Sequence, residues 1–321
     1  MIYALVLGAI TVGATVAAGY PFVGFMRGQK VGKEISEWAP QTHQVKAGTP
    51  TMGGLLLVLA IAAVTIAANF FGRYSIGLPL LVAGCLCALG FLDDLGSLQG
   101  RRQAALQRRV KLIAFIAVGI GAAIGLYEYL DLQTVNVPYE GRHDLGWAYI
   151  PIAVTVIVLC AGGVAVTDGL DGLAAGTLAI AFAAYGILAL HQDQTYLGAF
   201  CLTVTGACAG FLWHNAYPAR IFMGDTGALA LGGALAVVAF MTGQWLVLPA
   251  IGIIFVIEGL SVGMQVGYFR LTGGKRIFRK TPIHHHFEEG GLGEVQVTTR
   301  FWVVGLVGAL AGLALALEVY S

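Results

Sequence analysis

The sequence predicts an all-α polytopic membrane protein in which ten helices cross the bilayer and residues 1–321 form a single integral membrane domain. Three observations predict this fold class. Hydrophobic residues make up 58% of the chain and charged residues 11%, whereas a soluble domain carries about 25% charged residues. Apolar runs long enough to cross the roughly 30 Å of hydrocarbon in a bilayer recur along the chain. The Lys and Arg residues gather in alternate loops between these runs.

The apolar runs mark the expected membrane spans. They cover residues 2–25, 52–71, 75–92, 112–130, 148–166, 172–190, 196–213, 227–241, 245–268 and 301–317. The first run has no basic segment before it and no evident cleavage site, so we expect it to be retained as a span. The run at 227–241 is the shortest, and we expect a tight hairpin between it and the next run. The 46 glycines suit close packing of helices in lipid.

The distribution of basic residues predicts the orientation of these spans. Of the 18 Lys and Arg residues, all but Arg73 and Arg142 lie in loops that follow odd-numbered runs. Loops rich in Lys and Arg face the cytoplasm. We therefore expect both termini on the periplasmic side. The net charge of +1 gives no general attraction to nucleic acid, so we expect no nucleic-acid partner.

The candidate functional residues all fall in the expected cytoplasmic loops. Two adjacent carboxylates, Asp93 and Asp94, end the third apolar run. A charged side chain at this depth costs free energy, so an acid found there usually serves a function. Three more loop carboxylates are Asp168, Asp171 and Asp225, and residues 284–286 are consecutive His. Three consecutive His cannot easily converge on one ion, which argues against zinc. Carboxylates surrounded by Lys and Arg suit Mg²⁺-assisted phosphoryl transfer. An active-site cleft on the cytoplasmic side of a bundle implies one lipid substrate and one soluble substrate.

Each of these motifs also has a structural interpretation. Asp93 and Asp94 could cap a helix end, and Asp168 and Asp171 could be N-caps of the span at 172–190. The three His residues could lie in an exposed loop without function. Glu258 lies in the middle of an apolar run and is better interpreted as a buried, partnered structural acid.

Several motifs together resemble a known family over nearly the whole chain. The motifs are His43-x-x-Lys46-x-Gly48-Thr49-Pro50-Thr51-Met52-Gly53-Gly54, Asp93-Asp94, Thr167-Asp168-Gly169-Leu170-Asp171-Gly172, Asn215 with Phe222-Met223-Gly224-Asp225-Thr226-Gly227, and Pro282-Ile283-His284-His285-His286-Phe287-Glu288. The chain resembles the phospho-N-acetylmuramoyl-pentapeptide transferases, a branch of the polyprenyl-phosphate N-acetylhexosamine-1-phosphate transferases. The His triplet after Thr-Pro-Ile resembles this branch more than its relatives that use UDP-GlcNAc.

The resemblance implies the reaction and the setting. UDP-MurNAc-pentapeptide and undecaprenyl phosphate would give lipid I and UMP with Mg²⁺, the first membrane step of peptidoglycan synthesis. It also implies the bacterial cytoplasmic (inner) membrane, contact with membrane lipid, and a homodimer. Whether a phospho-enzyme forms on Asp93 or the lipid phosphate attacks directly stays open.

The resemblance also implies roles for individual residues. The catalytic residues would be Asp93, Asp94, Asp225 and His284, with Asp225 as the metal ligand. The substrate-binding residues would be Lys46, Thr51, Lys111, Asp168, Asp171, Asn215, His285 and His286.

One stretch departs from the family pattern. Gly162 and Ala165 stand where the family has Asn. The second position is expected near the nucleotide, so a side-chain amide contact worth about 1–3 kcal/mol would be missing.

Two alternative functions remain from the sequence. A polyprenyl-phosphate GlcNAc-1-phosphate transferase would share the same cytoplasmic set of carboxylates. A membrane transporter would place ionisable residues along a path through the membrane, and only Glu258 clearly meets that condition.

Overall fold

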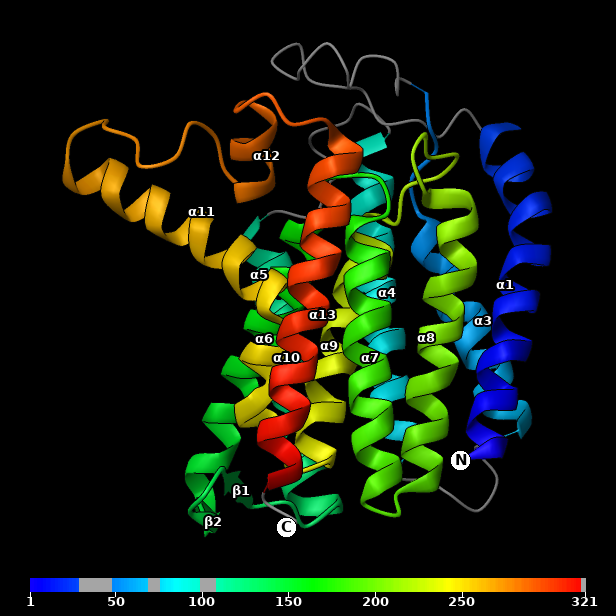
Figure 1. The fold of residues 1–321 in the computed structure, drawn as a ribbon, viewed down its shortest axis with the longest axis vertical. Helices are drawn as coiled ribbons and strands as arrows, with labels where there is room; N and C mark the ends of the chain where they lie inside the picture. The colour runs from blue at the N-terminus through cyan, green and yellow to red at the C-terminus, as the bar shows by residue number, and fades with distance from the viewer. Residues whose placement is uncertain (29–47, 69–75, 99–107, 319–321) are drawn as a thin grey trace.

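The computed structural model describes residues 1–28, 48–68, 76–98 and 108–318, which form a bundle of long helices (Figure 1). The helices are α1 (Ile2–Gly28), α3 (Gly53–Ala68), α4 (Gly77–Leu98), α5 (Arg108–Ile124), α6 (Tyr149–Thr167), α7 (Leu173–His191), α8 (Thr195–Asn215), α9 (Gly224–Met241), α10 (Leu248–Ile251), α11 (Ile253–Leu271), α12 (Ile283–Glu288) and α13 (Glu294–Glu318). A π-helical segment, Gly125–Tyr129, continues α5, and 3-10 turns at Gly146–Ala148 and Trp245–Val247 precede α6 and α10.

The centre of the bundle is α9, which packs against α3, α4, α6 and α7. Every residue from 226 to 240 is buried. A helix that is apolar on all sides is stable only with neighbours on all sides. Small residues allow these neighbours to approach, since a Cβ on Gly232 would lie 2.6 Å from Cα of Ala161 in α6. The shortest expected span is therefore the core of the bundle.

The two ends of the bundle differ. α1 begins and α13 ends at the lower end in Figure 1, whereas α12 lies at the upper end. The connection between α8 and α9 also lies at the upper end (Figure 1). Asp94, near the end of α4, is hydrogen-bonded to Thr226 at the start of α9, so the carboxylates of both helices lie at this end. The bundle therefore brings the polar motifs to the end opposite the start of α1, as the sequence predicts.

The structure bears out a bundle of many membrane-length helices, and it differs from the prediction in three respects. Among the described residues, nine helices are long and apolar enough to cross a membrane, and α3, at 16 residues, is shorter. The prediction of one continuous span at 245–268 is wrong, because the helix is interrupted at Gly252 between α10 and α11. The short α10 packs on glycines of α13, where a Cβ on Gly308 would lie 2.5 Å from the Ala250 carbonyl. After this break α11 leaves the bundle obliquely (Figure 1).

The third difference is a small hairpin, so the structure is not wholly α-helical. Strands β1 (Thr134–Val137) and β2 (Gly141–Asp144) pair antiparallel, with Val135 opposite His143. Strands of four residues in a polar loop are too short for a clear alternating pattern, which is why the sequence did not predict them.

Candidate active site

Lys111 joins two carboxylates that come from different helices. Its Nζ lies 2.6 Å from Oδ2 of Asp93 and 2.5 Å from Oδ2 of Asp225. Asp93 is near the end of α4, Lys111 is in the first turn of α5 and Asp225 is in the first turn of α9. The three side chains are 23–31% exposed, so they are open to a ligand from solvent. The structure thus gathers three residues that the sequence assigned to one reaction.

Asp94 has a different environment from its neighbour Asp93. Its side chain is buried and Oδ2 accepts hydrogen bonds from the backbone N–H of Thr226, at 3.1 Å, and from Oγ1 of Thr226, at 2.6 Å. A carboxylate is favourable at this place because the first turn of a helix has unpaired N–H groups and a positive dipole end. Asp94 therefore ties the end of α4 to the start of α9 and sets the distance between Asp93 and Asp225.

Gly224, directly before Asp225, is held from two sides. Its backbone N–H donates to Oδ2 of Asp168 at 2.8 Å. Its φ is +73°, which glycine adopts most readily. A Cβ here would lie 2.5 Å from Oδ2 of Asp94 and 2.7 Å from Oγ1 of Thr51. Thr51 and Asp168 therefore lie next to the carboxylate cluster, as expected for residues of one site.

Asp171 and Asn215 connect two loops beneath this cluster. Oδ2 of Asp171 accepts from the backbone N–H of Ala219 at 2.9 Å. Asn215 accepts from the N–H of Gly172 at 3.1 Å and donates to the Ile221 carbonyl at 2.9 Å. Both side chains are buried. They hold the loop between α6 and α7 against the loop between α8 and α9.

The N-cap interpretation of the two loop acids is wrong. Gly172 is the N-cap residue of α7, and no side chain makes a capping hydrogen bond there. The carboxylates of Asp168 and Asp171 instead reach backbone N–H groups of Gly224 and Ala219. Long-range partners of this kind cannot be read from local sequence.

The motif at residues 50–54 pairs directly with the loop before α9. Phe222 N–H donates to the Pro50 carbonyl at 2.8 Å, and Gly53 N–H donates to the Phe222 carbonyl at 2.8 Å. Gly54 N–H donates to the Met223 carbonyl at 2.9 Å. Lys46, the other residue assigned from this motif, lies outside the described residues.

His284 is fully buried and pairs with Glu258 of α11. Nδ1 of His284 lies 3.0 Å from Oε1 of Glu258. This contact holds the imidazole ring in one orientation. A Cβ on Gly169 would lie 2.3 Å from Nε2, so this nitrogen faces the loop that holds Asp168. The interpretation of Glu258 as a buried, partnered acid is confirmed, and its partner is one of the predicted site residues.

The next two histidines point elsewhere. Nδ1 of His285 lies 2.7 Å from Oε2 of Glu288. Burial lowers the pKa of His285 below its usual value, and the Glu288 carboxylate opposes this shift without reversing it. Nδ1 of His286 accepts from the backbone N–H of Arg279 at 3.2 Å. The triplet lies in α12 and His284 is buried, so the interpretation as an exposed loop is wrong.

No group of three or more His, Cys, Asp or Glu residues in the described ranges is arranged as a metal site. The three histidines have different partners, which are Glu258, Glu288 and the backbone of Arg279. Two carboxylates do converge on one position, which Lys111 Nζ holds.

Some residues of the site were not assigned a role from the sequence. Thr226 binds Asp94, and Oε1 of Glu294 at the start of α13 accepts from the Asp171 N–H at 2.7 Å. Thr226 lies beside Asp225, and that proximity was the available signal. Gly162 lies on α6 at a position where the family that the sequence resembles has Asn. A Cβ added at Gly162 would have no atom within 4 Å, so there is space for a side chain.

Comparisons with known proteins give the family. A model described as "Glycosyl transferase family 4" matches residues 75–243. A pattern described as "Phospho-N-acetylmuramoyl-pentapeptide-transferase signature 1" matches residues 46–58. The match at 75–243 spans Asp93, Lys111, Asp168 and Asp225.

Full-length relatives agree with this assignment. The chain is similar to proteins named phospho-N-acetylmuramoyl-pentapeptide-transferase from three bacteria. It is 46% identical to that of Chloroflexus aurantiacus over 99% of this chain and 90% of the relative. It is 45% identical to that of Geobacillus kaustophilus over 93% of both, and 41% identical to that of Listeria monocytogenes over 92% of this chain and 93% of the relative. The chain therefore belongs to the phospho-N-acetylmuramoyl-pentapeptide transferase family.

Proposed function

We propose that this chain transfers phospho-MurNAc-pentapeptide from UDP-MurNAc-pentapeptide to undecaprenyl phosphate, giving lipid I and UMP. In the net reaction, an oxygen of the acceptor phosphate bonds to the phosphorus next to the sugar. The diphosphate P–O bond breaks and UMP leaves. The observation that carries the proposal is the position of Lys111 between Asp93 and Asp225 at one end of a membrane bundle of this family.

The charges of the cluster suit this reaction. A diphosphate and a lipid phosphate bring several negative charges together, and a cation is needed to neutralise them. Lys111 is 28% exposed and can exchange a carboxylate for a phosphate oxygen. Asp93, at 23% exposed, is the residue placed to activate the acceptor phosphate. Asp94 is buried and hydrogen-bonded to Thr226, and its role is to position Asp93 and Asp225.

Asp225 and Asp93 also fit a divalent cation. One oxygen of each lies within 2.6 Å of the same Lys111 nitrogen, so two hard oxygen ligands converge on one cationic position. Mg²⁺ prefers such ligands. We propose Asp225 as its protein ligand, with Asp93 beside it. When bound, Mg²⁺ would supply further neutralisation of phosphate charge.

The remaining predicted residues are proposed to form the nucleotide and sugar pocket. Asp168, Asp171 and Asn215 shape its backbone through their bonds to the loop at 219–224. Thr51, Lys46, His285 and His286 are proposed to line it. His284 is proposed to act from the side of Gly169, where its Nε2 points.

The membrane topology is also part of the proposal. We propose ten spans with α3 as the tenth, both termini in the periplasm, and the carboxylate cluster facing the cytoplasm at the inner membrane. The basic residues of the expected cytoplasmic loops support this orientation. We also propose a homodimer.

Release of UMP by the purified full chain tests the function. The assay supplies undecaprenyl phosphate, Mg²⁺ and either UDP-MurNAc-pentapeptide or UDP-GlcNAc, with Asp93→Asn and Asp225→Asn variants beside the natural protein. We expect release from the pentapeptide substrate alone, and its loss in both variants and without Mg²⁺. Release from UDP-GlcNAc alone would overturn the substrate assignment. Full activity of Asp225→Asn would overturn the role of the cluster.

A further inference from the structure

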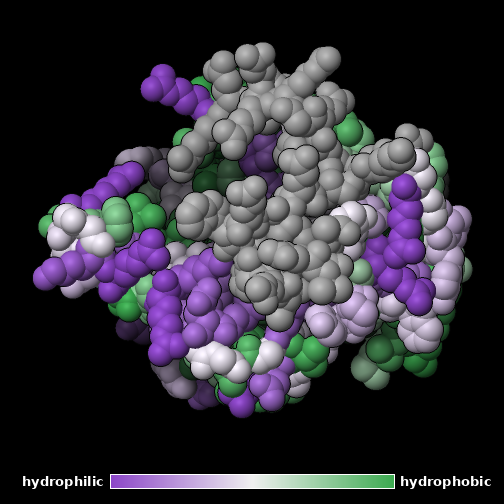
Figure 2. Space-filling model, turned by 90° about the horizontal axis from the view of Figure 1, so that it is seen from above, coloured by the Kyte–Doolittle hydropathy of each residue, from purple (hydrophilic) through white to green (hydrophobic). Residues whose placement is uncertain are grey.

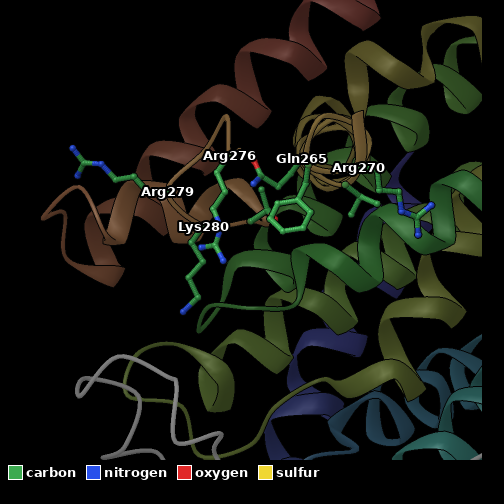
Figure 3. Close-up of a pocket in the computed structure, with 8 residues that line it drawn as sticks. Gln265, Arg270, Arg276, Arg279 and Lys280 are labelled. Atoms are coloured by element: carbon green, nitrogen blue, oxygen red, sulfur yellow. The ribbon is translucent and has the colours of Figure 1, made fainter. Parts of the chain in front are cut away.

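A cleft lies outside the carboxylate cluster, between α11 and the segment that leads from it to α12. Its volume is about 290 Å³. The residues that matter for its chemistry are Gln265, Phe269, Arg270, Arg276, Arg279 and Lys280 (Figure 3). None of the carboxylates of the proposed active site lines it, and neither does Lys111.

The segment is attached to α11, so the cleft is a built feature. Oε1 of Gln265 accepts from the backbone N–H of Ile277 at 3.1 Å and of Phe278 at 3.0 Å. Arg279 donates from Nη1 to the Glu289 carbonyl at 2.9 Å. These bonds hold residues 277–279, which lie between Arg276 and Lys280.

The cations of the cleft are available for an anion. The ion pairs found within the described residues include no acid for Arg270, Arg276 or Lys280. Arg276 and Lys280 both line the cleft, and in the view of Figure 3 their side chains extend in the same direction. Within the part of the chain that the structure describes, the cleft thus has cations with no carboxylate partner, and such cations can bind a phosphate group.

The surface beside the cleft is apolar. Met264 is 50% exposed, Phe269 46% and Leu271 89%. They lie on the part of α11 that projects from the bundle, at the left in Figures 1 and 2. In Figure 2 hydrophobic and hydrophilic residues lie side by side on this projection. In a multi-pass protein such a surface meets acyl chains with its apolar residues and head groups with its cations.

We propose that this cleft binds the phosphate of an anionic glycerophospholipid from the surrounding bilayer, with the acyl chains along the exposed apolar residues of α11. Arg276 and Lys280 bind the phosphate, and Arg270 adds charge at the other end of the cleft. The ligand is a bilayer lipid and not the acceptor of the reaction, because the cleft shares no residue with the carboxylate cluster. The inference rests on the membrane placement of the chain and not on the proposed activity.

Lipid retention by the full-length protein tests the proposal. The protein is purified from bilayer discs of phosphatidylcholine with 20% phosphatidylglycerol, and bound lipid is counted by native mass spectrometry. The test variant is Arg276→Gln/Lys280→Gln. The matched control is Lys275→Gln/Arg300→Gln, which removes two exposed cations that do not line the cleft. We expect the test variant to bind phosphatidylglycerol about 30-fold more weakly than the natural chain, and the control to match the natural chain.

Further arms separate the possible sources of phosphate. The charge-preserving variant Arg276→Lys/Lys280→Arg is expected to retain the lipid, which shows that loss in the test variant comes from charge and not from misfolding. An equal loss of bound phosphatidylglycerol in the control variant would overturn the site, because the lipid would then be attracted by the general positive charge of this surface and not by the cleft. Displacement of phosphatidylglycerol by equimolar undecaprenyl phosphate or by UDP would also overturn it, in favour of a substrate site.

Discussion

Nδ1 of His284 lies 3.0 Å from Oε1 of Glu258, and both side chains are fully buried. The pair joins α12 to α11 at the point where α11 leaves the bundle. It also turns Nε2 of His284 toward Gly169. The acid in the middle of an apolar span therefore has its partner in the helix that bears the histidine motif.

Glu258→Gln is expected to lower kcat for UMP release about 10-fold while leaving KM for the nucleotide substrate unchanged. Gln keeps the shape of the side chain and an oxygen that can hydrogen-bond Nδ1, so the ring stays in place, but the carboxyl group is replaced by a neutral amide. The split between kcat and KM separates this role from a structural one, because a disturbed fold would change KM as well. Glu258→Ala is the contrasting variant: it leaves His284 unpaired and should destabilise the fold by about 3–5 kcal/mol.

An unchanged kcat in Glu258→Gln would show that the pair serves packing alone.

Lys111→Gln is expected to abolish most UMP release and to increase the stabilisation of the protein by Mg²⁺. Without the ammonium, Asp93 and Asp225 face each other with no cation between them, so a divalent ion should bind more tightly. Thermal-shift titration with MgCl₂ measures the second effect. Arg109→Gln is the control, because Arg109 is exposed and two positions away. Weaker Mg²⁺ stabilisation in Lys111→Gln than in the natural chain would contradict the proposed convergence of ligands.

Two glycine substitutions are expected to have opposite effects on the melting temperature. Gly224→Ala should destabilise the fold by about 2 kcal/mol or more and reduce activity, because φ is +73° and the new Cβ would meet Asp94 and Thr51. Gly162→Ala should stabilise the fold by about 1 kcal/mol, since a helical position with open space gains helix propensity. Thermal unfolding in detergent compares the two. Equal melting temperatures would mean that the close contact at Gly224 does not constrain the site.

His285 is expected to make the fold less stable in mild acid. Its pKa is lowered by burial in the folded chain, so the unfolded chain binds the proton more tightly. Stability therefore falls as the pH drops through the usual His value of about 6.5, and His285 has no effect on it at higher pH. His285→Gln should show a smaller drop in melting temperature between pH 7.5 and pH 5.5 than the natural chain. The exposed His143 provides the control, and a His285→Gln curve parallel to that of the natural chain would contradict this prediction.

Much of the site was predictable because its residue types are unusual in an apolar chain. Asp93, Asp94, Asp168 and Asp225 stand out against long hydrophobic runs, and their position at alternate span ends places them at one end of the bundle. The adjacent acids Asp93 and Asp94 could not be told apart, because their difference depends on Thr226 and Lys111, which are far away in the sequence. The same holds for Asp168 and Asp171, whose partners lie in the loop before α9.

The sequence by itself determined the class of protein, the approximate spans, the common side of the polar motifs and the family. These follow from composition, run length, charge and motif, which are local properties of the chain. Only the tertiary structure decided that α9 is the buried centre, that the span at 245–268 breaks at Gly252, and that His284 pairs with Glu258. These features depend on which helices pack together, and helix packing is set by the fit of small residues and buried polar partners across elements that are distant in sequence.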